Sequence, residues 1–329
     1  MAEVLTETLV LALDIGGTNS RGEIMRWEGG TLSEPLATHS LPTPTGDGDA
    51  AIETIISLSS TLLESVDPAE RTNVRAVGLG VPGVLDSDTG LVKLASNLGW
   101  NDRYVASELQ AALGIPVYLT HDVTAAGVAE KRLGAGRGVE DVLAVFLGTG
   151  IAATLVSGGK IVRGGLMPSG NRQPAGEIGH MPIVQDGPWC ACGQRGCLEL
   201  FCSARAIGQI YSKALGIDPC GPELKTSRDL VENLSTDPIA ATVWDEATRN
   251  LAFGLFSAAM VTGPTRIILG GGLAAAGSIL VDPVEARMKE LATVIEAPEI
   301  VLAQLGQRAG VLGVALMTID WLGALQQVA

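Results

Sequence analysis

The hydrophobic pattern of this chain repeats one plan in its two halves. In the first half, a buried strand predicted over 9–13 leads through a Gly-Gly-Thr turn into a second strand over 20–27. In the second half, a strand over 142–147 leads through Gly-Thr-Gly into another strand over 151–156. A plan that occurs once in each half predicts two related domains that face a cleft.

The remaining periodicity alternates between helices and strands. Apolar positions at helical spacing predict helices over 50–65, 104–113, 204–215, 237–261 and 311–325. Short apolar runs predict strands over 74–80, 117–120 and 266–269. This alternation is typical of the α/β class. We expect a small domain formed by residues 1–121 with the C-terminal helix 311–329, and a large domain formed by residues 122–310.

Length and composition agree with this picture. The 329 residues suffice for two domains, and 47% of them are apolar against 18% charged, so the chain can bury a substantial core. The 42 glycines, against four Phe and three Tyr, indicate many tight turns and a core of small aliphatic side chains. The net charge of −14 argues against nucleic acid as a partner, because an acidic surface repels a phosphate backbone.

Neither end of the chain predicts a membrane segment. Residues 1–9 carry two Glu and no Lys or Arg, unlike the start of a secretory signal. The apolar stretch 311–325 is interrupted by Gly313, Asp320 and Gly323 and is shorter than the roughly 20 residues that a span needs. We therefore expect a buried C-terminal helix and a soluble, cytoplasmic protein.

A group of cysteines predicts a metal site. Three of the five Cys fall in a short glycine-containing segment downstream of a histidine, which together gives the set His180, Cys190, Cys192 and Cys197. One His and three Cys fit a closed, tetrahedral structural zinc site, and the alternative is a group of buried thiols without metal. The other two cysteines, Cys202 and Cys220, are expected in the core.

Glycine-rich turns provide candidate phosphate sites. In the first turn, Gly16, Gly17 and Thr18 follow Asp14, and such turns let backbone N–H groups approach an anion. Asp14 could hold Mg²⁺, directly or through water. Alone, this turn is equally consistent with a plain hairpin, and its pairing with Gly148-Thr149-Gly150 favours phosphate. A third cluster, with Gly271 and Gly272, could pack against a base or form an ordinary turn.

Three carboxylates complete the candidate chemistry. Asp122 ends a predicted strand and begins a predicted helix, so it is either the N-cap of that helix or a general base that takes a proton from an attacking hydroxyl. Glu177 and Glu199 flank the proposed zinc ligands, so the metal would hold both carboxylates where they can accept hydrogen bonds from sugar hydroxyls.

These motifs resemble the ROK sugar kinases (repressor, open reading frame, kinase). The first turn is similar to that family's first phosphate loop, and Glu-x-Gly-His followed by Cys-x-Cys-Gly-x-x-Gly-Cys-x-Glu matches its zinc segment over residues 177–199. The resemblance covers residues 14–272. It implies an actin/hexokinase-like (ribonuclease H-like) fold of two domains, with ATP and Mg²⁺ bound in the central cleft. It also implies a dimer or tetramer.

The resemblance assigns roles to single residues. Asp122 is similar to the family's catalytic base. The sugar contacts would be Asn97, His121, Asp122, Glu177, His180 and Glu199. Zn²⁺ would be held by His180, Cys190, Cys192 and Cys197, and the nucleotide would contact Asp14, Gly16, Gly17, Thr18, Gly148, Thr149, Gly150, Gly271 and Gly272.

The sequence departs from the family pattern in three places. His121 stands where the family usually has Asn, so one sugar contact changes. Ala152 and Ala153 stand where the second phosphate loop usually has more glycine, and their methyl groups could crowd the phosphates. The unusual stretch 168–174 would shape the sugar pocket.

The leading hypothesis is an ATP-dependent kinase that phosphorylates the 6-hydroxyl of an aldohexose, with glucose first because Glu177 is typical of the family's glucokinases and N-acetylglucosamine kinases. Kinases of N-acetylglucosamine or N-acetylmannosamine are the alternatives within that class. A sugar-sensing regulator of the same family is a second possibility, although only 13 residues precede Asp14. A protein that binds sugar without turnover is a third, supported by His121, Ala152 and Ala153.

Overall fold

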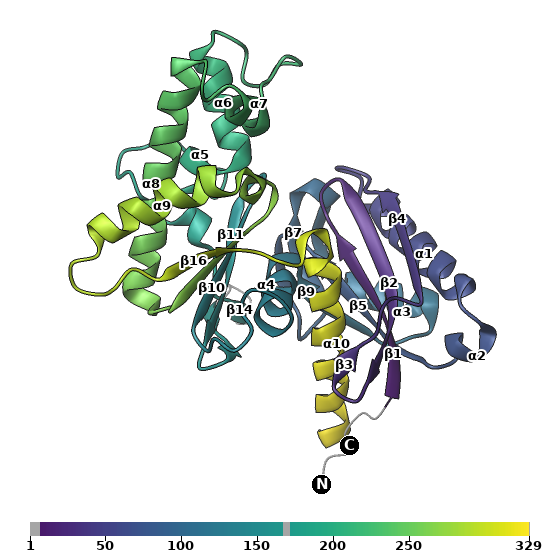
Figure 1. Cartoon of the computed structure of the whole chain (residues 1–329). Helices are drawn as coiled ribbons and strands as arrows, with labels where there is room; N and C mark the ends of the chain where they lie inside the picture. Colours follow the sequence, from purple (N-terminus) through teal and green to yellow (C-terminus); the bar gives the residue numbers. More distant parts are fainter. Residues whose placement is uncertain (1–6, 167–171, 329) are drawn as a thin grey trace. The chain divides into compact units, whose positions relative to one another are not determined.

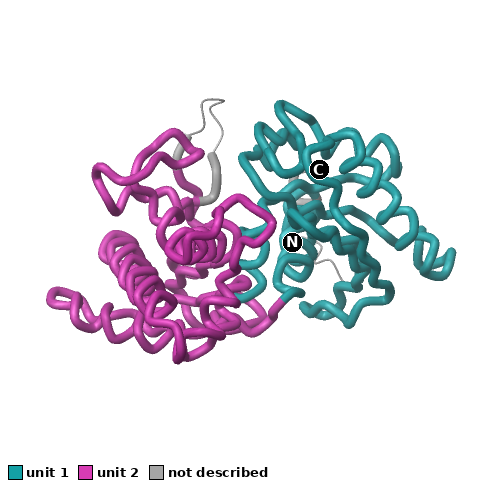
Figure 2. The backbone as a smooth tube through the Cα atoms, turned by 90° about the horizontal axis from the view of Figure 1, so that it is seen from above, with its two compact units in different colours: residues 1–130, 165–173, 307–329 teal, residues 131–164, 174–306 magenta. Residues whose placement is uncertain are grey.

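The computed structural model describes residues 7–166 and 172–328. The chain divides into two compact units: unit 1 contains residues 1–130, 165–173 and 307–329, and unit 2 contains residues 131–164 and 174–306 (Figure 2). The C-terminal helix belongs to unit 1. The helix that begins at Asp122 is also counted with unit 1, as far as Glu130.

Unit 1 is built on a six-stranded sheet with the order β3-β2-β1-β5-β9, to which β4 adds at β2 (Figure 1). Its strands are β1 Glu7–Ile15, β2 Asn19–Glu28, β3 Thr31–Leu32, β4 Ala37–Pro42, β5 Val74–Val81 and β9 Val117–His121. β1, β5 and β9 are parallel, and β2 returns antiparallel to β1. In this register Asp14 pairs with Gly80 and Gly80 pairs with Thr120, so the carboxyl ends of the three strands are level.

Helices cover this sheet. Its strands contact α1 Gly48–Ser65, α3 Val105–Leu113 and α10 Ala309–Val328. The short helix α2 Pro68–Arg71 contacts α1, and α4 Asp122–Arg132 follows β9. The side chains of Leu9, Leu11 and Leu13 join the core cluster that contains residues of α1 and α3. Val10 and Ala12, which alternate with them, are also buried. Both faces of β1 are therefore covered, which explains why its sequence is a continuous apolar run rather than an alternating one.

The last helix is a core helix of unit 1. The segment Gly306–Leu325 is apolar and long enough to cross a membrane by length and composition, but half of it is buried. α10 contacts β1 and β5, and Val311, Val314 and Leu316 are almost completely buried. Side chains of this size each contribute roughly 1.5–3 kcal/mol when they are fully buried. The buried C-terminal helix expected from the sequence is confirmed.

A small three-stranded sheet forms a second part of unit 1. It consists of β6 Val84–Asp86, β7 Leu91–Ala95 and β8 Trp100–Arg103, with the 3₁₀ helix η1 Ser96–Leu98 between the last two strands. The Trp100 indole N–H donates to the carbonyl of Gly48 at 2.9 Å, which ties this sheet to the start of α1. The sheet was not foreseen from the sequence. Its importance is that η1 carries Asn97.

Unit 2 repeats the plan of unit 1. Its five-stranded sheet has the order β12-β11-β10-β15-β16, formed by β10 Val142–Leu147, β11 Ile151–Ser157, β12 Lys160–Ile161, β15 Arg266–Gly270 and β16 Glu299–Leu302. β11 is antiparallel to β10, whereas β15 and β16 are parallel to it. Two further strands, β13 Arg163–Leu166 and β14 Arg172–Pro174, pair with each other, and the division between the two units falls within each of them.

Helices and short 3₁₀ segments complete unit 2. They are η2 Ile178–His180, α5 Glu199–Cys202, α6 Ala204–Ala214, α7 Ser227–Glu232, α8 Pro238–Thr262, η3 Gly272–Ala276 and α9 Ser278–Leu291, followed by η4 Gly306–Arg308 at the boundary with unit 1. α9 contains Pro283, whose missing N–H leaves the carbonyl of Ile279 without its helical partner. The indole N–H of Trp244 donates to that carbonyl at 3.2 Å, so α8 compensates for the proline.

The predicted helices and strands are all present, within a few residues of their expected ends. The α/β class predicted from their alternation is confirmed. The elements that were not foreseen include, besides the small sheet, β4, α7, α9 and β16. In α9, Pro283 interrupts the pattern on which a helix prediction depends.

Candidate functional site

The residues predicted to act fall into two groups, one in each unit. In unit 1, Asp14 and Asp122 lie at the same edge of the sheet. Asp14 stands in the row that pairs with Gly80 and Thr120, near the end of β1, and Asp122 follows β9 as the first residue of α4. Parallel strands thus bring together two carboxylates that are far apart in the sequence. With Gly16, Gly17, Thr18, Asn97 and His121, they form what we call the unit 1 site.

Asp14 is a carboxyl group in a poorly solvated position. Burial, and next the charge of Asp122, raise its pKa from 3.8 to about 7, although Arg21 acts in the opposite direction. Its carboxylate lies against Gly310 in the first turn of α10, where any side chain would overlap it. A helix N-terminus favours a nearby negative charge, and a cation bound at Asp14 would balance its charge further.

Asp122 and His121 form a local hydrogen-bonded group. The N–H of Val123 donates to Oδ1 of Asp122 at 2.7 Å and approaches Nδ1 of His121 at 3.2 Å. The same Nδ1 lies 3.2 Å from Oδ1 of Asp122, and the two side chains are 17% and 24% exposed. Asp122 is the first residue inside α4, and its Oδ1 accepts the adjacent N–H rather than one two or three residues ahead, so this bond is not the one that the capping alternative requires. Both side chains keep solvent access, as a proton acceptor for a substrate requires.

Asn97 lies beside the first glycine-rich turn. A Cβ added to Gly17 would be 3.3 Å from Nδ2 of Asn97. The carbonyl of Asn97 accepts the N–H of Gly46 at 2.9 Å, which fixes the backbone of η1 near the start of α1. The amide predicted to contact sugar is therefore adjacent to the loop predicted to contact phosphate.

In unit 2, two glycine-rich turns share one end of the sheet. Gly148, Thr149 and Gly150 follow β10, and Gly271 and Gly272 follow the neighbouring parallel strand β15. The backbone of Gly271 has a φ of 83° and lies so close to Leu147 that a side chain would collide with it. At Gly272 an added Cβ would meet no atom within 4 Å, so this position is open.

The carboxylate of Glu199 supports loop 148–150. Its Oε2 accepts the N–H of Ile151 at 2.8 Å and lies where a side chain of Gly150 would be. Glu177, the other acidic residue of the zinc segment, is exposed and precedes η2. The glycine turns, both glutamates and the cysteine group form what we call the unit 2 site.

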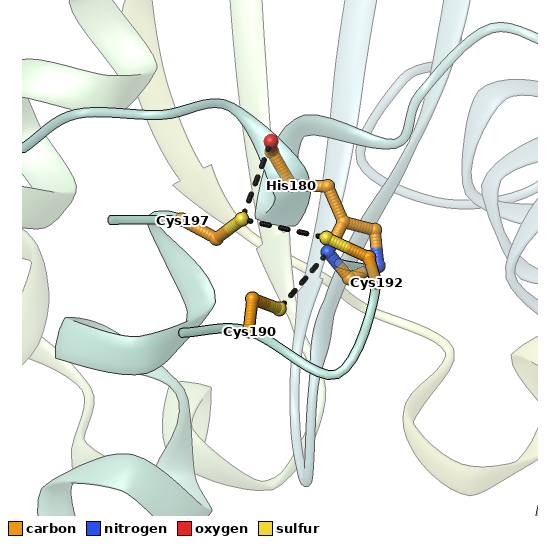
Figure 3. A group of neighbouring side chains, drawn as sticks. All are labelled: His180, Cys190, Cys192 and Cys197. Carbon is orange, nitrogen blue, oxygen red and sulfur yellow. Dashed lines mark hydrogen bonds between the residues drawn. The ribbon is translucent and has the colours of Figure 1, made fainter. Parts of the chain in front are cut away.

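The four predicted metal ligands are close together (Figure 3). The ligand atoms of His180, Cys190, Cys192 and Cys197 all lie within 4.8 Å of one another. Nδ1 of His180 is 3.7 Å from Sγ of Cys190, and the Sγ atoms of Cys192 and Cys197 are 3.6 Å apart. In a tetrahedral zinc site, bonds of about 2.3 Å to sulfur and about 2.0 Å to nitrogen separate neighbouring ligand atoms by about 3.5–3.8 Å. The residues present therefore fit Zn²⁺, with His180 binding through Nδ1.

A glycine shapes the turn that carries the thiols. The N–H of Gly193 donates to the carbonyl of Cys190 at 3.0 Å, and the N–H of Cys190 donates to the carbonyl of Gln194 at 2.8 Å. Gly193 has a φ of 87°, which a glycine adopts without strain. Burial, and next the neighbouring Cys192 and Cys190, raise the pKa of the Cys197 thiol to about 12. A bound cation would favour the thiolate instead.

The two remaining cysteines differ. Cys202 is buried in the core of unit 2, as expected. Cys220 is exposed, so its predicted place in the core is wrong. Its N–H donates to Oδ1 of Asp218 at 3.0 Å, which is the pattern of a surface turn.

Comparison with known proteins decides the family. The profile of the ROK family matches residues 10–320. The chain belongs to the ROK family. It is 30% identical to a glucokinase of Halalkalibacterium halodurans over 94% of each chain. A ROK hexokinase of Thermus thermophilus is 30% identical, with a TM-score of 0.76 over 95% of this chain and all of that one.

A ROK family glucokinase of Streptomyces griseus, solved in complex with glucose and AMPPNP, is 29% identical. Its TM-score is 0.76 over 94% of this chain and 98% of that one. These neighbours confirm the expected actin/hexokinase-like fold class. The predicted enzyme class, a sugar phosphotransferase, is supported by the same relatives.

Two of the three departures from the ROK pattern can be located. Ala153 is buried among the core residues of unit 2, so its methyl group is part of the core. Ala152 is half-buried and pairs with Phe146. His121 lies beside Asp122, as described above. The third departure, the stretch 168–174, falls largely outside the described residues.

The sequence did not single out two positions that the structure brings to these sites. Gly310, in α10, lies against Asp14, and Ile151 donates its N–H to Glu199. Gly310 lies just before the helix predicted over 311–325, and in α10 it is three residues from Gly313 and on the same side of the helix. Gly313 approaches the backbone of Ala125 in α4 closely enough to exclude a side chain.

Proposed function

We propose that this protein is an ATP-dependent kinase that transfers a phosphoryl group to the 6-hydroxyl of an aldohexose, with glucose as the preferred sugar. The observation that carries the proposal is the kinship, over nearly the whole chain, to a glucokinase that binds glucose and AMPPNP. The geometry within each unit supports it: unit 1 brings two carboxylates to the same sheet edge as a glycine-rich turn, and unit 2 brings together a glycine-rich loop and four possible metal ligands.

Asp122 is proposed as the general base. It takes the proton of the sugar hydroxyl as that oxygen attacks phosphorus, while the bond from phosphorus to the bridging oxygen of ADP breaks. Its position at the start of α4, held by Val123 and partly exposed, supports this role. His121 is proposed to contact the sugar and to help fix the Asp122 carboxylate, from which its Nδ1 lies 3.2 Å away.

Asp14 is proposed to hold Mg²⁺, directly or through water. A desolvated carboxyl group with a pKa near 7 next to a second carboxylate fits a site that a cation completes. Bound Mg²⁺ supplies charge neutralisation for the phosphates. The backbone N–H groups of the two glycine loops are proposed to hold the phosphates themselves, which places the leaving group without requiring a basic side chain.

The sugar is proposed to be bound by Asn97, Glu177, His180 and Glu199. With Nδ1 directed to the metal site, the other ring nitrogen of His180 is available to a sugar hydroxyl. Zn²⁺ is proposed to be structural: four protein ligands leave no open position for a reacting group, so its contribution is to fix the segment that carries the glutamates.

The experiment that tests this function is a coupled ADP-release assay over a panel of sugars. Glucose, mannose, N-acetylglucosamine and N-acetylmannosamine are supplied with ATP and Mg²⁺, and we expect the highest kcat/KM with glucose. A higher kcat/KM with an acetylhexosamine would show that this sugar, and not glucose, is the preferred substrate. If no sugar releases ADP while sugar binding is measurable by calorimetry, the protein binds sugar without turnover and the proposal is wrong.

A further inference from the structure

Loop 148–150 is held at both ends by the chain that leaves the zinc site. At one end, the carbonyl of Gly148 accepts the N–H of Ala204 at 2.8 Å. At the other end, the N–H of Ile151 donates to Oε2 of Glu199 at 2.8 Å. Glu199 comes two residues after the metal ligand Cys197, and Ala204 begins the next helix, α6. A single short stretch of chain therefore fixes both ends of the loop.

The chain that enters the zinc site runs along the same strand. The N–H of Ala153 donates to the carbonyl of Gly176 at 2.8 Å. Gly179, directly before the ligand His180, lies so close to the carbonyl of Ile151 that any side chain would collide with it. Ile151 is thus enclosed from two sides: its N–H binds Glu199 after the metal ligands, and its carbonyl packs against Gly179 before them.

The bond to Glu199 also determines which donors remain for an anion. Within the loop, the N–H of Gly148 donates to the carbonyl of Gly150 at 2.9 Å, and the N–H of Ile151 donates to Glu199. The N–H groups of Thr149 and Gly150 are the candidates that remain for phosphate. A carboxylate would repel phosphate if it faced it, so its value here lies in orienting the peptide groups of the loop.

We propose that Glu199 is a positioning residue for loop 148–150, so that the zinc-binding segment sets the affinity for the nucleotide as well as for the sugar. This inference rests on the proposed function, because it assumes that the loop binds phosphates. The metal ligands connect the two arms that enclose Ile151, and loss of the metal releases both. Sugar bound to Glu199 would then act on the nucleotide loop through a single side chain.

The test compares three variants by equilibrium binding of Mg·AMPPNP in the absence of sugar. Glu199→Ala removes the acceptor for Ile151, and we expect the Kd for Mg·AMPPNP to rise about tenfold, the scale of a lost charged hydrogen bond. Glu199→Gln keeps an acceptor oxygen and should recover most of that loss. Glu177→Ala is the matched control, since Glu177 is on the other arm: it should weaken glucose binding and leave the Kd for Mg·AMPPNP unchanged.

Hydrogen exchange at the Ile151 amide provides a readout that needs neither nucleotide nor activity. Exchange should accelerate in Glu199→Ala and in protein stripped of metal by a chelator, and stay at the wild-type rate in Glu177→Ala. Wild-type nucleotide affinity in Glu199→Ala, or unchanged exchange at Ile151, would overturn the positioning role. If the wild-type protein binds no Mg·AMPPNP, the proposed function fails, and exchange at Ile151 still decides whether Glu199 positions the loop.

Discussion

The two units use the same strand arrangement to present different chemistry. In each, a strand passes through a glycine-containing turn into an antiparallel partner, and parallel strands follow on the other side, as in β2-β1-β5-β9 and β11-β10-β15-β16. The unit 1 site uses side chains at the ends of these strands, whereas much of the unit 2 site lies on a segment outside the sheet. The comparison separates side chains that a regular sheet positions from side chains that depend on a segment outside the sheet.

The difference is visible in how each acidic side chain is held. Asp14 is fixed by the pairing of β1 and by the close approach of α10, and the surroundings disfavour its charge. Glu199 follows a described stretch, 181–198, that contains no helix or strand and is held by turns and by two isolated bridges, Pro182 with Cys197 and Trp189 with Arg195. Metal ligation, as proposed above, would add to the free energy that orders this segment.

The largest expected effect is on catalysis in unit 1. Asp122→Asn removes the proposed proton acceptor but keeps the shape, and we expect kcat to fall about 10²–10⁴-fold while glucose still binds. The measurement is steady-state ADP release together with calorimetric glucose binding. Asp102→Asn is the matched control: Asp102 is an exposed residue with a φ of 50°, which Asn tolerates, and turnover should stay at the wild-type level. A near-wild-type kcat in Asp122→Asn would show that Asp122 is not the general base.

The second effect tests whether unit 2 binds the proposed zinc and depends on it for stability. One zinc per chain should copurify, and Cys197→Ser should lose it and lower the free energy of unfolding by about 3 kcal/mol or more. Hydrogen exchange should accelerate in unit 2 before unit 1. Cys220→Ser is the matched control, because this thiol is exposed, and it should change neither zinc content nor stability. A metal-free protein of full stability would show that both units are held by ordinary packing alone.

The same contrast explains what the sequence could predict. The strands and their glycine turns could be predicted because β1 and β10 are buried on both faces, which gives continuous apolar runs, and because their turns need glycine. The grouping of His180 with the three thiols could be predicted because one His and three Cys in a short segment are typical of residues that share a metal ion. Both signals are local, and each is carried by residues close together in the chain.

Contacts that depend on packing between distant segments could not be predicted from the sequence. The approach of Gly310 to Asp14 depends on how α10 docks on the sheet, and the bond from Ile151 to Glu199 depends on the path of the zinc segment. Cys220 was misplaced because its apolar character suggested burial, whereas the turn at Asp218 keeps it on the surface. In each case the deciding partner lies outside the local pattern.

The third prediction concerns the protonation of Asp14 in unit 1. Because the folded-state pKa of Asp14 is about 7 and the unfolded value is 3.8, the folded protein holds a proton that the unfolded chain releases. This group therefore makes the protein less stable as pH rises from about 4 to about 7. Without Mg²⁺, Asp14→Asn should be more stable than the wild type at pH 8, by on the order of 1–3 kcal/mol, and the difference should vanish near pH 4. Chemical unfolding across this pH range measures it, and a difference independent of pH would contradict the shifted pKa.

The smallest expected effect concerns two glycines of the same helix. Gly323→Ala adds a methyl group where no atom lies within 4 Å, and it should stabilise α10 by about 0.5–1 kcal/mol through the helix propensity of alanine. Gly310→Ala has the same intrinsic preference, but its methyl group would overlap the carboxylate of Asp14, so the gain should be cancelled or reversed. Thermal unfolding of both variants gives the difference in stability.

The Mg²⁺ concentration for half-maximal activity should rise only in Gly310→Ala, because displacing Asp14 disturbs the proposed metal ligand. Equal behaviour of the two variants would mean that α10 contributes packing to the unit 1 site and does not position its carboxylate.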